Sequence, residues 1–174
     1  MAALGPKMLT DANRRLAFVP TLTDYHLPTA TECNAGIDLS LRVTAANFAL
    51  GATGDASIVE PPLGASNEAS APGRTTYEAA ANFFRFINEL DDVAWTTFTK
   101  KGIAGYLVSR IGQHPEGTKA HEHAFTAGDE VQVYAVLSGT PQIQSPDGAG
   151  YEKFRMVFNV QEEVDERAVI AGTV

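Results

Sequence analysis

The sequence predicts a mainly β protein: a β-sandwich or barrel with one flanking α-helix, a long loop and an N-terminal arm. Three observations lead to this fold class. Apolar and polar residues alternate along several segments, as they do in strands with one buried face. Clusters of Gly, Pro, Asp and Ser separate these segments. Only one segment combines an amphipathic helical face with recognisable helix ends. We therefore expect one helix, with six or so strands around one core.

The composition suits a single folded domain. An apolar fraction of 44% in 174 residues is enough for one core. The net charge of −8 argues against a protein that binds nucleic acid through its phosphates, because neutralising phosphates requires clustered Lys and Arg. The single cysteine, Cys33, excludes an internal disulfide and a Cys-based zinc site. Without a signal-peptide pattern or an apolar run of membrane-spanning length, we expect a soluble protein made in the cytoplasm.

Residues 1–36 form the predicted N-terminal arm, ahead of a domain that spans 37–174. Prolines interrupt the short apolar groups of the arm, and neither a helical nor a strand period persists. We expect the arm to become ordered by docking on another surface. The domain opens with a predicted strand over 37–44, where four aliphatic residues alternate with polar ones.

Residues 51–74 are the most loop-like stretch. Four glycines, three prolines and many Ala and Ser residues leave little apolar surface to bury, and a short strand over 57–60 is the only regular structure expected there. Unstructured connections of this length are uncommon in compact domains and are mostly functional or mobile. In the subunit of a polymer, such a loop can reach a neighbouring copy.

The segment 74–87 fits a helix by its apolar spacing and a strand by its content of Thr and aromatic residues. We expect a long strand. The alternation slips at Phe83 and Phe84, which predicts a β-bulge near these residues.

The one helix that the sequence predicts begins after Asp91 and Asp92, which serve as its N-terminal cap. Lys100 and Lys101 occupy its expected last turn, and Gly102 lies just past it. Its apolar face carries three residues: Ala94, Trp95 and Phe98.

The remainder is predicted to be β-structure. Strands are expected over 103–111, 129–137, 151–160 and 167–174, with a Gly- and Pro-rich turn over 139–150. Both alternating faces of 129–137 contain apolar residues, so both should be covered. The inward face of 151–160 is expected to carry Phe154, Met156, Phe158 and Val160.

One group of residues has the chemistry of a metal site: His114 with His121, Glu122 and His123. Imidazoles and carboxylates are common ligands of zinc and non-haem iron. In an extended segment His121 and His123 point to one side, which supplies two ligands where a held site needs three with support behind them. We interpret the segment as a polar loop and predict no metal and no cofactor.

No motif for catalysis is present. The chain lacks a Gly-x-Ser-x-Gly elbow, a Walker loop and a Gly-x-Gly-x-x-Gly segment, so no catalytic residues are predicted. Asp91 and Asp92 are better explained as helix caps than as paired catalytic carboxylates. An acidic group is either a solvated turn or a special feature, and both interpretations stay open. It contains Glu162, Glu163, Asp165 and Glu166.

Several short segments open or form the predicted strands in a recognisable order. They cover residues 28–30, 34–39, 72–77, 102–110, 127–134 and 154–160. Their order and spacing resemble the major tail tube proteins of long, flexible-tailed bacteriophages, the siphophages. The resemblance extends over most of the chain from Pro20 onward.

The resemblance implies a non-enzymatic structural subunit on a β-sandwich that closes toward a barrel. It implies rings of six subunits, with an inner wall that is a joined β-barrel, stacked into the tube through which genomic DNA leaves the capsid without specific binding. The expected partners are further copies of this chain, the tape measure protein, the tail terminator and the distal tail protein, and no membrane. The protein would be made in the host bacterial cytoplasm and end in the virion tail.

Two alternatives stay open. One is another virion or secretion-tube ring component on a similar β fold, such as a tail terminator, which self-assembly into long tubes would separate from a tail tube protein. The other is a small metal-dependent β-barrel enzyme that uses the histidines, which the metal content of the purified protein would test.

Overall fold

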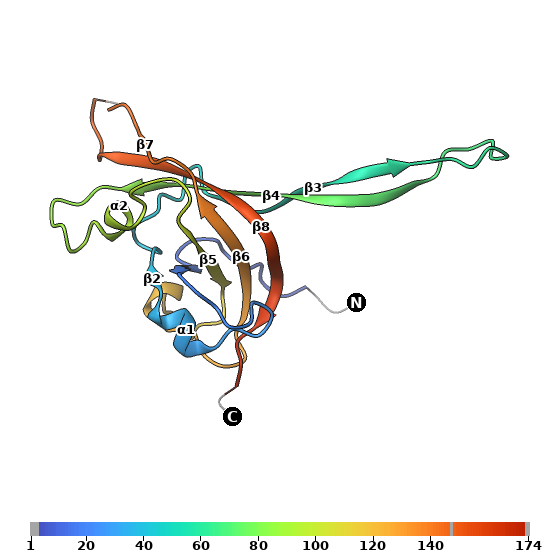
Figure 1. The fold of residues 1–174 in the computed structure, drawn as a ribbon. Coiled ribbons are helices and arrows are strands. Elements are labelled where there is room, and N and C mark those ends of the chain that lie inside the picture. The colour runs from blue at the N-terminus through green and yellow to red at the C-terminus, as the bar shows by residue number, and fades with distance from the viewer. Residues whose placement is uncertain (1–3, 147, 173–174) are drawn as a thin grey trace.

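The computed structural model describes residues 4–146 and 148–172 as a coiled β-structure from which a long hairpin projects (Figure 1). These residues contain eight strands: β1 (Arg14–Val19), β2 (Ile37–Asp38), β3 (Ala49–Val59), β4 (Ser70–Phe84), β5 (Ala104–Ile111), β6 (Glu130–Ser138), β7 (Gln142–Ile143) and β8 (Lys153–Val169). They also contain three short helices: α1 (Ala30–Ala35), α2 (Val93–Thr97) and the 3₁₀ helix η1 (Ala120–Glu122). The predicted mainly β fold class is confirmed.

The described strands form one antiparallel sheet in the order β2-β1-β5-β6-β8-β4-β3, with β7 paired to β8. The sheet coils until its two sides meet through the chain that follows β2. There the Thr44 amide donates to the Asn82 carbonyl at 2.9 Å, and the Phe84 amide donates to the Arg42 carbonyl at 2.9 Å. These hydrogen bonds to β4 close the sheet into a barrel.

The inside of the barrel is an aromatic core. Phe83 stacks on Phe154 with 5.2 Å between ring centroids, and Phe18 meets Phe98 edge-on at 5.0 Å. Helix α2 closes on this core with the face that the sequence predicts, consisting of Ala94, Trp95 and Phe98. The inward residues predicted for β8 are also confirmed: Phe154, Met156 and Phe158 are buried, and Val160 packs against them.

Two details of the predicted helix are wrong. Asp92 stands at the N-cap position without capping, because its carboxylate pairs with Nε of Arg85 at 2.8 Å. The helix ends at Thr97, so Lys100 and Lys101 lie beyond its last turn. Gly102 takes a left-handed conformation with φ of 84°, which ends the connection to β5.

A second apolar cluster covers the outer face of β1, β5 and β6. It contains Ala17, Val19, Cys33, Val108, Phe125, Val131, Val133, Ala168 and Ile170. Helix α1 packs here through Cys33, which is buried. The sequence analysis missed α1, although its signal is present: Thr29 and Glu32 form a capping box in which each side chain bonds the other residue's backbone amide.

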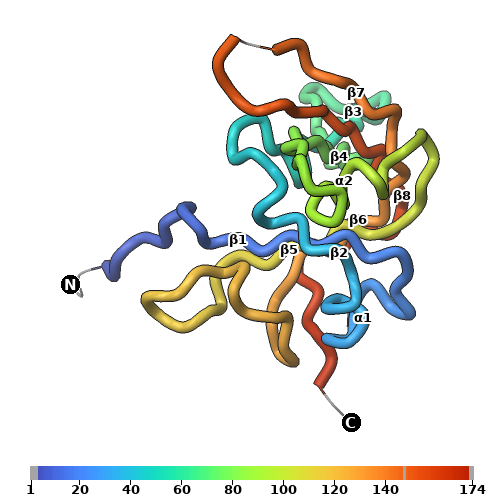
Figure 2. Tube along the Cα trace, turned by 90° about the vertical axis from the view of Figure 1, so that its left-hand side faces the viewer, coloured from blue at the N-terminus to red at the C-terminus, as the bar shows by residue number. Residues whose placement is uncertain are grey.

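The predicted N-terminal arm over 1–36 is wrong for most of its length; residues 1–3 lie outside the described part. Strand β1 pairs with β5 from Arg14 opposite Ile111 to Val19 opposite Tyr106, and it is buried from Leu16 to Val19. Residues 4–13 alone leave the barrel, and they run beside the 112–123 segment (Figure 2). Three hydrogen bonds hold them there: the Ala120 amide donates to the Ala12 carbonyl, the Gly112 amide donates to the Asn13 carbonyl, and the His114 ring bonds the Asn13 side chain.

Three further strand predictions need correction. The strand expected over 37–44 stops at Asp38, because the chain turns at Leu39, whose carbonyl accepts from the amides of Arg42 and Val43. The bulge expected at Phe83 and Phe84 is absent, since β4 stays in register with β8 through Phe84.

The segments 151–160 and 167–174 belong to a single strand, β8, of 17 residues rather than to two strands. Residues 173 and 174 lie outside the described part. The turn predicted over 139–150, of which residue 147 is not described, contains the short strand β7.

Candidate assembly surfaces

The segment predicted as a loop over 51–74 is instead the outer part of a long β-hairpin. Strand β3 pairs with β4 from Ala49 opposite Ala80 to Val59 opposite Ser70. On its other side β4 pairs with β8 only from Ala79 onward. Residues 51–78, the projecting hairpin, therefore extend away from the barrel as a two-stranded ribbon whose outer edges carry no strand of the described chain (Figure 1).

The projecting hairpin is mostly exposed on both faces. A two-stranded ribbon with no buried face is marginal by itself in water. Free edges of this kind pair readily with another chain unless they are protected. The outer edges of the hairpin thus offer backbone groups that pair with no strand of the described chain.

A carboxylate ties the base of the hairpin to β8. Oε1 of Glu166 accepts from the Ala52 amide at 3.2 Å and from the Tyr134 hydroxyl at 3.0 Å. The β3–β4 register shifts immediately after Ala52, so the β3 backbone is irregular where the carboxylate binds it. Burial first, and then the bond to Glu166, raises the pKa of Tyr134 well above its usual value.

The acidic group Glu162–Glu166 is part of the strand β8, so its interpretation as a turn is wrong. Three of its four carboxylates have partners on other elements. Glu163 accepts from the Tyr106 hydroxyl, which raises the pKa of Tyr106 to about 12, and Asp165 lies 2.5 Å from Nδ1 of His26. These contacts position β8 against β5 and the chain that follows β1.

The histidine segment is held by the ring of His114 and by the backbone carbonyls of His121 and His123. His114 binds Asn13 Oδ1 at 2.8 Å and Thr118 Oγ1 at 3.2 Å, and its ring lies parallel to that of His123 with 6.4 Å between centroids. The carbonyls of His121 and His123 accept from Arg15 at 2.8 and 2.7 Å. Within residues 4–146 and 148–172, no three His, Cys, Asp or Glu side chains gather as metal ligands.

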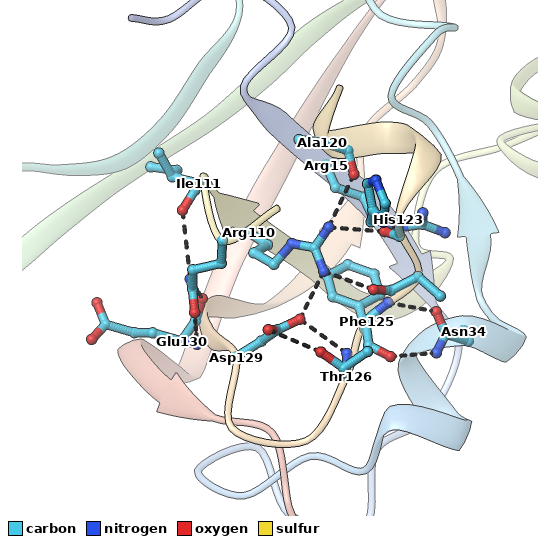
Figure 3. Close-up of polar contacts among 12 residues, drawn as sticks. Arg15, Asn34, Arg110, Ile111, Ala120, His123, Phe125, Thr126, Asp129 and Glu130 are labelled. Carbon is cyan, nitrogen blue, oxygen red and sulfur yellow. Dashed lines mark hydrogen bonds and ion pairs between the residues drawn. The ribbon is translucent and has the colours of Figure 1, made fainter. Parts of the chain in front are cut away.

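Arg110 is the buried centre of this region, with 1% of its surface exposed (Figure 3). Its guanidinium donates to the carbonyls of Ala120, His123 and Ala124 and pairs with Asp129 at 2.7 Å. Asp129 in turn accepts from the backbone and hydroxyl of Thr126. Sequence reasoning missed this site because an arginine in a strand gives no local sign of being buried.

Phe125 joins this region to α1. The side-chain amide of Asn34 donates to the Phe125 carbonyl at 2.8 Å, and the Asn34 oxygen accepts the Phe125 amide at 2.9 Å. These contacts hold Phe125 against the outer face of the sheet.

None of the helices in the described chain is long and apolar enough to cross a membrane.

The described chain thus combines a closed barrel, an outer face covered by a second apolar cluster and an exposed ribbon. A comparison with curated proteins found no match. The family model described as phage tail tube protein matches residues 1–173, which is nearly the whole chain. This chain belongs to the phage tail tube protein family.

Proposed function

We propose that this protein is the repeating, non-enzymatic subunit of the tail tube of a long, flexible-tailed phage. Six copies form a ring, and rings stack into the hollow conduit for DNA. The observation that carries the proposal is the projecting hairpin, whose edges and faces are unused in the monomer. Together with the family match, it makes a subunit that completes its sheet only by contact with neighbours.

Ring formation uses the strand edges that the barrel leaves free. Before Ala79, toward the hairpin tip, β4 is separated from β8, so β4 and β8 each have an open edge on the sides that face one another. A strand from a second copy can add to such an edge with regular backbone hydrogen bonds. Repeating this addition around an axis removes the open edges and gives the inner wall of a joined barrel.

The net charge of −8 fits a conduit for DNA. Phosphate contacts from Lys or Arg would repeat in every ring and slow the passage of DNA, whereas an acidic lumen repels the phosphates. In this proposal DNA passes without specific binding. The tape measure protein, the tail terminator and the distal tail protein are the other partners, and the virion tail is the final location.

Electron microscopy of the concentrated, purified protein tests the proposal, and we expect hollow tubes of stacked rings. In the test variant, residues 53–76 are replaced by Asn-Gly, a two-residue turn that joins the paired positions Ala52 and Tyr77. This variant keeps the barrel and the bond of Glu166 to Ala52. We expect it to remain a folded monomer and to form no tubes.

Hydrogen exchange gives a second readout. In the monomer we expect fast exchange over 53–74 and strong protection of β1, because β1 is buried and the hairpin is not. The hairpin should become protected in the tube. Tubes that form equally well without residues 53–76, or a wild-type protein that stays monomeric at high concentration, would contradict the proposed function.

A further inference from the structure

One end of the barrel carries a group of neighbouring exposed apolar side chains, which we call the apolar end patch. It consists of Leu41, Phe86, Ile87, Ile143 and Tyr151. Leu41, Phe86, Ile87 and Tyr151 line a common hollow, and Ile143 lines the adjoining one. Contiguous exposed apolar surface of this kind usually marks a contact site.

The tip of the projecting hairpin carries a second set of exposed apolar residues. Ile58, Val59 and Leu63 are exposed, and Leu63 fully so. Pro61 and Pro62 lie between them and stiffen this connection. The hairpin tip is therefore a narrow projection that exposes apolar side chains.

The two surfaces lie at opposite ends of the same strand. Strand β4 begins at Ser70 near the hairpin tip and ends at Phe84 beside the apolar end patch (Figure 1). Its 15 residues span about 50 Å at the rise of an extended strand. The tip of one molecule cannot reach the patch of that molecule, so any contact between them joins two copies.

The two ends carry net charges of opposite sign. The projecting hairpin, residues 51–78, carries four acids, Asp55, Glu60, Glu68 and Glu78, against one base, Arg74. The segments 41–46, 84–103 and 138–155, where β4 and β6 finish and β8 begins, carry six bases against five acids in the sequence. The bases are Arg42, Arg85, Lys100, Lys101, Lys153 and Arg155; the acids are Glu89, Asp91, Asp92, Glu152 and Asp147, the last of which lies outside the described residues.

We propose that the hairpin tip of one copy docks into the apolar end patch of the next copy. The contact is head-to-tail, because each copy offers a tip at one end and a patch at the other, so it repeats without limit. Apolar burial of Leu63 in the hollow supplies affinity, and the acidic hairpin against the basic barrel end sets the orientation. The inference rests on the proposed tube function and names the surface that receives the hairpin.

Cross-linking between two single-cysteine additions tests the contact at low concentration. A Leu63→Cys copy is mixed with an Ile87→Cys copy and treated with a short bismaleimide. Both positions are fully exposed, so neither change should disturb folding, and the native Cys33 is buried. We expect the mixture to form a 63–87 linked dimer at least about tenfold faster than a control mixture with Leu27→Cys, an exposed leucine outside the patch.

Assembly supplies the second arm of the test. Ile87→Asp places a charge in the contact and should raise the protein concentration needed for tubes by about tenfold or more, whereas Leu27→Asp should leave it unchanged. Tubes of wild-type protein without a preferred 63–87 link would overturn this inference and leave the tube function standing. A preferred 63–87 link in a protein that forms no tubes would support the inference and contradict the tube function. Failure of both measurements contradicts both.

Discussion

Arg15 and Arg110 lie directly opposite each other on β1 and β5, and both guanidinium groups stack on the ring of Phe125, at 5.1 and 5.4 Å from its centroid. Two like charges facing each other across a sheet repel. Here the carbonyls of the 120–124 segment and the carboxylates of Asp38 and Asp129 surround them. The two arginines thus hold the irregular 120–124 segment against the outer face of the sheet.

Arg110→Met should lower the free energy of unfolding by about 3–5 kcal/mol, because it removes the cation paired with the mostly buried Asp129 carboxylate and one donor from each of three carbonyls. Urea denaturation measures the change. The matched control is Arg167→Met on β8, an exposed arginine whose loss should change stability by no more than about 0.5 kcal/mol. Equal stability of the two variants would show that the 120–129 segment does not depend on Arg110.

Gly105→Ala should destabilise the barrel, by about 1–3 kcal/mol. An added Cβ would lie 2.4 and 2.6 Å from ring carbons of Phe18, inside the aromatic core, and 3.0 Å from the Val19 carbonyl. Thermal unfolding compares this variant with Gly64→Ala at the hairpin tip, where a Cβ meets no atom within 4 Å. A Gly105→Ala protein as stable as the Gly64→Ala protein would contradict the close packing of β5 on Phe18.

The stabilisation that Glu32 gives to α1 should depend on pH. Hydrogen bonds from Thr23 and then Thr29 lower the pKa of Glu32 from 4.5 to about 2. Because the folded-state pKa is depressed, the stabilisation is present above pH 4.5 and is lost as the pH falls through about 2. Glu32→Gln should therefore be less stable than wild type at pH 7, and the difference should vanish near pH 2. A difference that stays constant over this range would rule out the carboxylate as its cause.

Glu166→Ala should lower the pKa of Tyr134, because it removes the carboxylate that accepts the Tyr134 hydroxyl. Burial is the larger cause of the raised pKa and remains, so Tyr134 should still ionise above its usual range. Ultraviolet titration with Tyr134→Phe as the assignment control measures the shift. Glu163→Ala is the matched variant: it should lower the pKa of Tyr106 from about 12 and leave Tyr134 unchanged.

The sequence alone determined the elements whose apolar residues follow the period of a strand or a helix. In β8 the alternation from Phe154 to Phe158 reports one buried side, and the apolar residues on both sides of β6 report two. The short α2 was also visible, because Ala94, Trp95 and Phe98 share one helical face. The family resemblance drew on the segments of β6 and β8 and not on α2.

Tertiary contacts decided the rest. Strand β1 is apolar on both faces from Leu16 to Val19, so it shows no period, and its burial follows from β5 pairing with it some 90 residues later in the chain. The projecting hairpin buries neither face, so a Gly- and Ala-rich strand there looks like a loop. A local pattern reports how much of each face is buried and not which distant residue covers it. The closure of the barrel by residues 42–44 and the burial of Arg110 depend on such distant partners, and only the folded chain brings them together.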